Sequence, residues 1–433
     1  MKKSLHIAVA GAVLTLGAGI SGTSMASGFA IIENSASGMG QAFAGAAAVA
    51  EDPSTVYFNP AGMMYLKGTQ MTVGLHIINS RAEFNDKGST DLSNLGALST
   101  TRGNDGGDAG DTFYVPNFYY VQDFGDKYKI GLGVNAPFGL KTEYDNGWMG
   151  RYTSTNSEVK SINFNPAIAF RANDRLSIGL GLNIQYFEAT LEKDIYQTAI
   201  GGAPDGSAKV KGDSWELGFN IGFIYEITQA TRIGMHYRSK ITHKLEGDVK
   251  YKNVSPLLGL KNQDVTASID TPATFSLSLT QQLNDRLTLL ADITFTSWSN
   301  FDELRIVGDT IDQIPTVKEK WDDAYRYSLG MKYAYNAQWT LRTGVAHDKT
   351  PISDRRRTSR IPGDDRFWLS FGASYSPSSS LTIDAGYSHL WVDDTNINEE
   401  YSLLKPLTGV SGRLKGDYDS SVDILSVQAT WKF

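Results

Sequence analysis

The sequence contains no cysteine and, beyond its first residues, no long apolar run. Without cysteine, neither a disulfide framework nor a thiolate site can form. After residue 26 no stretch approaches the 18 consecutive apolar residues that a membrane-spanning helix requires. The chain is therefore not a helical membrane protein, and an architecture without disulfides must stabilise it.

Basic residues are also in deficit, with 40 Lys and Arg against 47 Asp and Glu. A nucleic-acid partner would require a basic surface, so this class of partner is excluded. Histidines are scattered through the chain and form no grouping with Ser and Asp that would indicate a catalytic triad. We therefore predict no enzyme, no metal and no cofactor; a membrane-embedded lipase or protease is the weakest alternative.

Residues 1–26 have the pattern of a secretory signal peptide. Lys2 and Lys3 precede an apolar run from Ile7 to Ile20, and Ser24-Met25-Ala26 forms a small-residue cleavage site. A membrane anchor is the alternative, but the run is too short to span a bilayer. We predict export, with a mature chain that begins near Ser27 and in which acidic residues outnumber basic ones by nine.

The whole sequence is rich in glycine (43 residues) and aromatics (11%), and in the exported part apolar residues alternate with polar or small ones. From Leu176 to Ile184 every second residue is apolar, and Ser177, Gly179, Gly181 and Asn183 lie between them. Period two indicates a strand with one apolar face. Soluble β-sandwiches alternate as well, so a single strand does not identify the class.

The arrangement of strands and connections is more specific. About 14 segments qualify as strands, each long enough to cross a bilayer at a tilt: 69–79, 113–123, 128–138, 158–171, 175–191, 212–227, 231–247, 264–282, 286–300, 323–335, 338–347, 366–376, 380–392 and 416–433. Short connections such as 124–127 and 335–337 alternate with long ones such as 80–112 and 301–322. This rhythm is typical of outer-membrane barrels, with short turns in the periplasm and long loops outside.

Residues 27–66, which precede the first strand, carry almost no charge before Glu51 and Asp52. A solvated tail would be charged, so we predict a plug inside the lumen of a barrel formed by 67–433. A periplasmic flap packed on the rim is the alternative. The fold prediction is an all-β, 14-stranded antiparallel transmembrane β-barrel with an N-terminal plug.

Several motifs resemble the FadL family of outer-membrane long-chain fatty acid transporters. They include Gly28-Phe29, the run from Glu33 to Gly40, Asn59-Pro60-Ala61-Gly62-Met63, the run from Gly133 to Leu140, Asp323-Ala324-Tyr325-Arg326 and the run from Ile361 to Ser370. The chain also ends on Phe433 after alternating apolar residues, which resembles the recognition signal of barrel-assembly machinery. The resemblance covers essentially the whole mature chain.

The resemblance implies a mechanism in which a ligand captured from outside leaves sideways into the outer membrane through a kink in the third strand. It assigns Asn59, Pro60 and Ala61 to a hatch motif that meets the kink, and Asn135, Pro137, Phe138 and Gly139 to the kink. Pro137 lacks an N–H, and Gly139 permits unusual dihedrals, so strand pairing should break here. We expect the Asn59 amide to satisfy the exposed backbone groups. Alternatively, Pro137 ends the strand at the rim.

The expected ligand is a long-chain fatty acid, whose carboxylate requires a cation. By resemblance the best candidates are Lys318, Lys320 and Lys193, although all three could be solvated loop charges. The cluster of Arg355, Arg356, Arg357 and Arg360 could attract anionic ligands or lipopolysaccharide phosphates, but we interpret it as a solvated run. Neutral aromatic hydrocarbons are the alternative ligand, and a general porin is a less favoured function. We expect a monomer in the outer membrane.

Overall fold

The computed structural model describes residues 28–90, 103–197, 203–309, 316–403 and 410–433; the predicted signal peptide lies outside them. Its sheet closes on itself because the first strand, β1 (Gln70–Asp86), pairs with the last, β21 (Val410–Lys432), from Gln70↔Lys432 to Asp86↔Gly416. None of the described helices is long and apolar enough to cross a bilayer.

The described chain forms a barrel wall of 14 strands, all paired antiparallel, as the sequence predicted. Three of them are each divided into two parts, and the other wall strands are continuous. Besides β1 and β21, the wall comprises β2 (Thr112–Asp123), β3 with β4 (Tyr128–Asn135, Gly139–Glu143), β5 (Asn156–Arg171), β6 (Leu176–Ile195), β7 (Gly206–Thr228), β8 with β9 (Thr231–Arg238, Ile241–Lys252), β11 with β10 (Thr274–Gln282, Gln263–Thr271), β12 (Leu287–Thr296), β16 (Ala324–Ala334), β17 (Trp339–Asp348), β18 (Arg366–Ser378) and β19 (Leu381–Val392).

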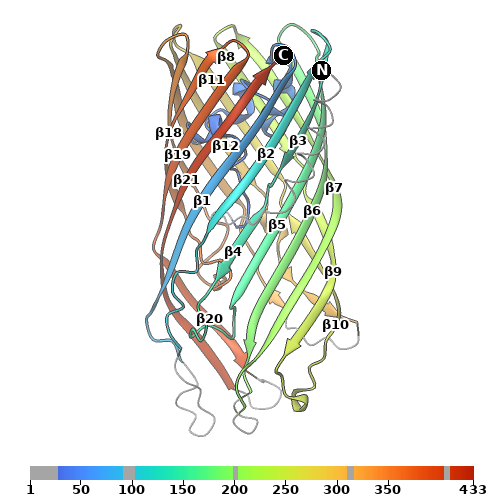
Figure 1. The fold of residues 1–433 in the computed structure, drawn as a ribbon, viewed down its shortest axis with the longest axis vertical. Coiled ribbons are helices and arrows are strands. Elements are labelled where there is room, and N and C mark those ends of the chain that lie inside the picture. The colour runs from blue at the N-terminus through green and yellow to red at the C-terminus, as the bar shows by residue number, and fades with distance from the viewer. Residues whose placement is uncertain (1–27, 91–102, 198–202, 310–315, 404–409) are drawn as a thin grey trace.

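Smaller elements occupy the connections at one end of the barrel, where the long loops lie (Figure 1). They are η5 (Pro256–Leu258), η6 (Trp298–Asn300), β13 (Glu303–Leu304), β14 (Ile306–Gly308), β15 (Val317–Lys318) and β20 (Thr395–Leu403). The C-terminus and the short turns lie at the opposite end. In outer-membrane barrels this asymmetry places the long loops outside the cell.

Two predicted strands differ from the structure in continuity, and several differ in length: β1 and β9 extend past the predicted ends at residues 79 and 247, and β7 and β21 begin before residues 212 and 416. The predicted strand 231–247 breaks at Ser239 and Lys240, and 264–282 breaks at Pro272 and Ala273. Pro272 has no N–H to contribute to a ladder, which explains the second break. The predicted strand 286–300 ends at Thr296 and continues as a short 3-10 helix, η6.

The two faces of the wall show which solvent each meets. On β6, Leu180 and Leu182 are 45% and 43% exposed on the outside, whereas Ser177, Asn183 and Gln185 point inward and are buried. A water-soluble sandwich would bury the leucines and expose the polar residues. The inverted pattern is that of a barrel whose outer surface contacts lipid and whose interior is polar.

The N-terminal segment lies inside the barrel, shown in blue in Figure 1. Its elements are α2 (Ala36–Met39), α3 (Ala46–Val49), α4 (Thr55–Phe58) and η2 (Pro60–Tyr65). Glycines on the inner wall allow its backbone to approach closely: a Cβ at Gly179 would lie 2.2 Å from Ala61 N, and one at Gly234 would lie 1.9 Å from Ala47 O. We call residues 28–66 the hatch.

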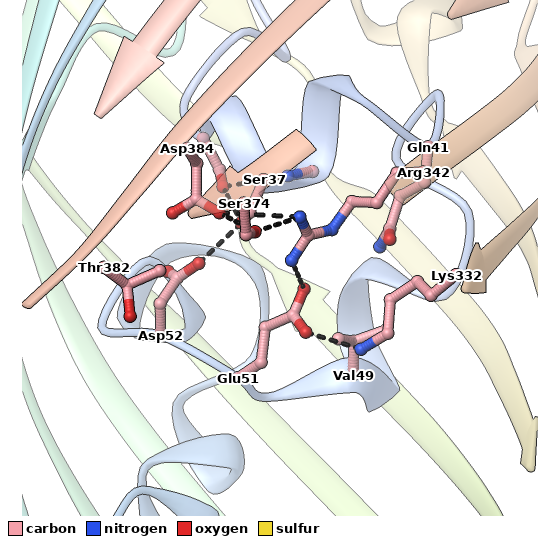
Figure 2. Close-up of polar contacts among 12 residues, drawn as sticks. Ser37, Gln41, Val49, Glu51, Asp52, Lys332, Arg342, Ser374, Thr382 and Asp384 are labelled. Carbon is pink, nitrogen blue, oxygen red and sulfur yellow. Dashed lines mark hydrogen bonds and ion pairs between the residues drawn. The ribbon is translucent and has the colours of Figure 1, made fainter. Parts of the chain in front are cut away.

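A polar network fixes the middle of the hatch to the wall (Figure 2). The Glu51 carboxylate accepts from Lys332 on β16 at 2.5 Å and from Arg342 on β17 at 3.0 Å. Arg342 also lies 3.5 Å from Asp384 on β19. The neighbouring Asp52 accepts from Gln428 on β21 at 3.1 Å. One short stretch of the hatch is thus bound to three different strands, β16, β17 and β21.

Candidate functional site

The third wall strand is interrupted where the sequence predicted. β3 ends at Asn135 and β4 begins at Gly139, and both remain paired with β5. On the other side β2 pairs only with β3, from Phe118↔Val134 to Asp123↔Lys129. The part of β2 before Phe118 therefore has no ladder partner on the side of β4, and the wall has a lateral interruption here.

The start of the hatch covers this kink. Ile31 N donates to Pro137 O at 2.8 Å, and Gly139 N donates to Phe29 O at 2.9 Å. The Ser161 hydroxyl donates to Phe138 O at 2.6 Å and accepts from Phe138 N at 2.9 Å. Backbone groups that leave the ladder are thereby satisfied within the protein, as hydrocarbon surroundings require.

Asn59 does not have the role expected from the sequence. Its amide donates to the carbonyls of Ala47, Phe223 and Met235, at 2.7, 3.1 and 3.3 Å. It thus fixes the hatch to β7 and β8, away from the kink. The prediction that Asn59 satisfies the kink is wrong because Phe29 and Ile31 reach those groups with their own backbone.

The rest of the Asn-Pro-Ala motif is structural in the same sense. Asn59 caps η2, since its side chain accepts from Ala61 N at 3.0 Å, and Pro60 occupies the first turn, where no N–H is needed. Gly139 is not among the described glycines with a positive φ, so the unusual dihedral expected there is not used. The break is instead explained by Pro137, which lies between β3 and β4 and has no N–H for the ladder.

An apolar cavity lies on the loop side of the kink, and its empty space together with the adjoining open solvent is about 790 Å³. Most of its walls are apolar side chains from the hatch, β4 to β7, β9, β10 and the outer loops: Phe29, Leu140, Val159, Phe187, Ala189, Leu191, Val210, Leu245, Val265, Ala267, Ile269, Phe301, Leu304, Ile306 and Ile361. Its charged lining residues are Lys211, Glu319 and Arg360. We call this the outer cavity.

Arg360 is held among neutral acceptors. Its guanidinium donates to Thr153 O at 2.7 Å, Ser157 Oγ at 2.8 Å and Ser154 Oγ at 3.2 Å. Within the described part of the chain, no carboxylate lies within ion-pair distance of it. A partly buried cation whose hydrogen bonds all go to neutral oxygens can receive an anion from the cavity.

Glu319 is the acidic residue of the outer cavity. It lies in the loop after β15, and Trp321 Nε1 donates to it at 3.0 Å. Burial raises the pKa of Glu319 to about 7, with smaller effects from Glu399 and Arg360. Its charge therefore changes close to neutral pH.

The predicted lysines do not line this cavity. Lys318 and Lys320 are exposed to solvent on the outer loop. Lys193, at the loop end of β6, is partly buried and within electrostatic reach of Arg360. The interpretation of the arginine cluster as a solvated run is wrong for two of its members. Arg357 is buried and forms ion pairs with Asp354 and Asp364, and Arg360 lines the outer cavity.

A second cavity lies between the hatch and the kink, and its empty space together with the adjoining open solvent is about 930 Å³. Ala30 and Ile31 line it on one side, and Pro137 and Phe138 on another. It is more polar than the outer cavity, with Arg238, Arg326 and Arg366 among its lining residues. The first residues of the hatch thus separate the two cavities, and Phe29 packs against Phe138, Phe187 and Trp298.

Comparison with known proteins agrees with this architecture. A family model described as "Outer membrane protein transport protein (OMPP1/FadL/TodX)" matches residues 17–433. The chain belongs to this family. Members of the family are transport channels of the outer membrane, and the lipid-facing surface of this FadL-family barrel agrees with that location.

Two curated relatives illustrate the range of similarity. The long-chain fatty acid transport protein of Escherichia coli K12 is 27% identical over 416 residues, covering 88% of this chain and 91% of its own. Outer membrane protein P1 of Haemophilus influenzae Rd is 30% identical over 425 residues, covering 90% of each chain.

Solved structures show the same fold. A Pseudomonas aeruginosa FadL homologue superposes with a TM-score of 0.85 at 27% identity, covering 94% of this chain and all of its own. The toluene transporter TodX of Pseudomonas putida superposes with a TM-score of 0.67 at 17% identity, covering 93% and 99% of the two chains. At this lower identity the likeness concerns the fold alone.

Proposed function

We propose that the chain takes up long-chain fatty acids, with Arg360 holding the carboxylate in the outer cavity and the acyl chain lying among its apolar walls. The observation that carries the proposal is the Arg360 guanidinium, whose hydrogen bonds go to neutral oxygens, on the wall of a mainly apolar cavity. The relative in E. coli, named a long-chain fatty acid transport protein, supports the same ligand class.

Release would be lateral, through the interruption between β2 and β4. From the outer cavity the path leads past Phe29 into the second cavity, whose wall includes Pro137 and Phe138. Opening this interruption requires two backbone hydrogen bonds to break, the one from Ile31 N to Pro137 O and the one from Gly139 N to Phe29 O. Delivery into water would cost about 0.8 kcal/mol for each CH₂ of the acyl chain, whereas delivery into the bilayer does not.

The ligand is tested by comparing Arg360→Gln with Arg355→Gln, an exposed arginine of the same loop. We expect Arg360→Gln to weaken oleate binding in detergent about 10- to 100-fold, the worth of a charge-assisted hydrogen bond of roughly 1.5–3 kcal/mol, and Arg355→Gln to leave it unchanged. Equal affinity in all three proteins would contradict the role of Arg360. Mass spectrometry of the co-purified ligand checks the class independently, since an aromatic hydrocarbon there would favour the alternative.

The exit is tested by Gly139→Trp, which places a large side chain beside the kink. We expect uptake of oleate by cells to fall severalfold, while binding in detergent and the heat-modifiable migration of the folded barrel stay as in the wild type. Unchanged uptake would move the exit elsewhere. A monomeric state and assembly by the barrel-assembly machinery stay predictions from the sequence.

A further inference from the structure

The barrel wall has a second interruption, between β7 and β9. Pairs run from Ser207↔Lys252 to Asp213↔Glu246, and the ladder resumes only at Asn220↔Arg238. Between these points β7 stays paired with β6, and β9 stays paired with β10. The two facing edges, 214–218 and 241–245, are not paired with each other. At about 3.3 Å per residue this unpaired stretch, which we call the β7–β9 seam, is roughly 16 Å long.

Side chains close the seam in place of a ladder. At one end Ser214 Oγ and His243 Nδ1 are 3.0 Å apart. Near the other end Ile241 packs on Gly218, where an added Cβ would lie 2.6 Å from Ile241 Cγ1. Ser239 then bonds to the backbone of Phe219. A closure of this kind opens by rotation of a few side chains, without the loss of a continuous ladder.

The inner side of the seam borders the outer cavity. Phe187 lines that cavity and stacks on His243 with ring centroids 4.8 Å apart, and Leu245 lines it from β9. Next to them Gly212 pairs with Gly247, and both line the cavity, so the wall has no side chains at this level. The Nε2 atom of His243 is buried and has no hydrogen-bond partner among the described residues, an arrangement that a polar group passing the seam would relieve.

The outer side of the seam lies at the membrane–water boundary. Towards the periplasm, Trp215 and Leu217 face outward and are 56% and 65% exposed, and a Trp at this level is typical of the interface. Towards the loops come charged residues of both signs: Lys211, which is paired with Glu188 at 3.0 Å, and the opposed Asp213 and Glu246. An anionic amphiphile at this level would have its tail beside Leu217 and its head beside Lys244, an exposed residue of β9 that lies level with Trp215.

We propose that the β7–β9 seam is a lateral entrance, through which a single-chain anionic amphiphile passes from the outer membrane interface into the outer cavity. The proposal rests on the proposed function, because it supplies the ligand that Arg360 would hold, and it adds an inward path distinct from the exit at the kink. A ligand that partitions into the interface reaches the cavity without crossing the water above the loops.

The test is a disulfide across the seam, Gly218→Cys with Ile241→Cys, in a protein with no other cysteine. A Cβ at Gly218 would lie 2.6 Å from Ile241 Cγ1, the atom bonded to Ile241 Cβ, so the two Cβ atoms are near neighbours, and a disulfide needs them about 3.5–4.5 Å apart. We expect oxidation to reduce oleate uptake about tenfold and dithiothreitol to restore it. The matched control is Leu329→Cys with Val345→Cys, an opposite pair in the intact ladder of β16 and β17, for which we expect no effect.

Equal uptake by the oxidised and reduced seam variant, with the cross-link complete, would overturn the entrance. If the wild type binds no oleate in detergent, both the proposed function and the proposed entrance are wrong. If the wild type binds oleate but the cross-link leaves uptake unaffected, only the entrance is wrong. Should the double variant not fold, Ser214→Cys serves instead, with a lipid-soluble maleimide applied to intact cells. Oleate should slow its labelling, and absent labelling or labelling unaffected by oleate would overturn the proposal.

Discussion

Replacing Glu51 with Ala should loosen the hatch without unfolding the barrel. Glu51 is 26% exposed, and its partners Lys332 and Arg342 are 20% and 5% exposed. Removing one partner of a fully buried ion pair costs about 3–5 kcal/mol. Since Glu51 and Lys332 are partly solvated, and Arg342 keeps Asp384 as a neighbour, we reduce this to about 2–3 kcal/mol. Each 1.4 kcal/mol is a factor of ten, so local opening of the hatch should become roughly 30- to 100-fold more frequent.

Hydrogen exchange measured by mass spectrometry reports this opening directly, because protected amides exchange through local unfolding. Peptides from the middle of the hatch should exchange about 30- to 100-fold faster in Glu51→Ala, while peptides from β17 and β18 should not change. The control is Asp248→Ala, which removes an exposed pair with Lys250 and should have no measurable effect. Unchanged exchange in the hatch would refute the idea that this network holds it in place.

Two further predictions concern the outer cavity and the lipid-facing surface. Because the pKa of Glu319 is about 7, its side chain becomes negatively charged as the pH rises from 6 to 8. This charge should weaken oleate binding on the order of tenfold, as expected for like charges roughly 10 Å apart. In Glu319→Gln the affinity for oleate should not fall over this pH range, and a fall of equal size in that variant would contradict the assignment. Leu329 lies on the lipid side of β16, and Leu329→Arg should lower the free energy of unfolding by about 2–4 kcal/mol in refolding titrations. Leu283→Arg, in a short turn, should lower it by at most about 1 kcal/mol. Equal losses in the two variants would contradict the assigned lipid boundary.

Alternation allowed the wall to be predicted because its period is fixed by the strand itself. On β6 the sequence pattern identifies two faces but does not show which faces inward, and the exposed Leu180 and buried Ser177 decide it. The break at Pro137 was predictable since proline cannot donate to a ladder. The break at Ser239 carried no such residue, and the seam it adjoins had no signal in the sequence.

The site was less predictable because it is assembled from distant parts of the chain. Arg360 reads as one charge in a basic run, and only the packing of its loop against Ser154 and Ser157 brings it to the cavity. Phe29 is one aromatic residue in an uncharged segment, and its carbonyl at the kink depends on the path of the hatch. A resemblance in motifs could place Asn59 near the hatch but not identify the strands it contacts.

The three divided strands follow one physical rule. Unpaired backbone cannot face hydrocarbon, so a wall strand can break only where other protein groups replace the ladder. At Pro137 the backbone of the hatch replaces the ladder. At the second break the backbone N–H and the hydroxyl of Ser239 replace it by bonding to the backbone of Phe219. Pro137 and Pro272 both line the second cavity, and the seam beside Ser239 borders the outer one. Each break therefore lies where the inner side of the wall meets a cavity.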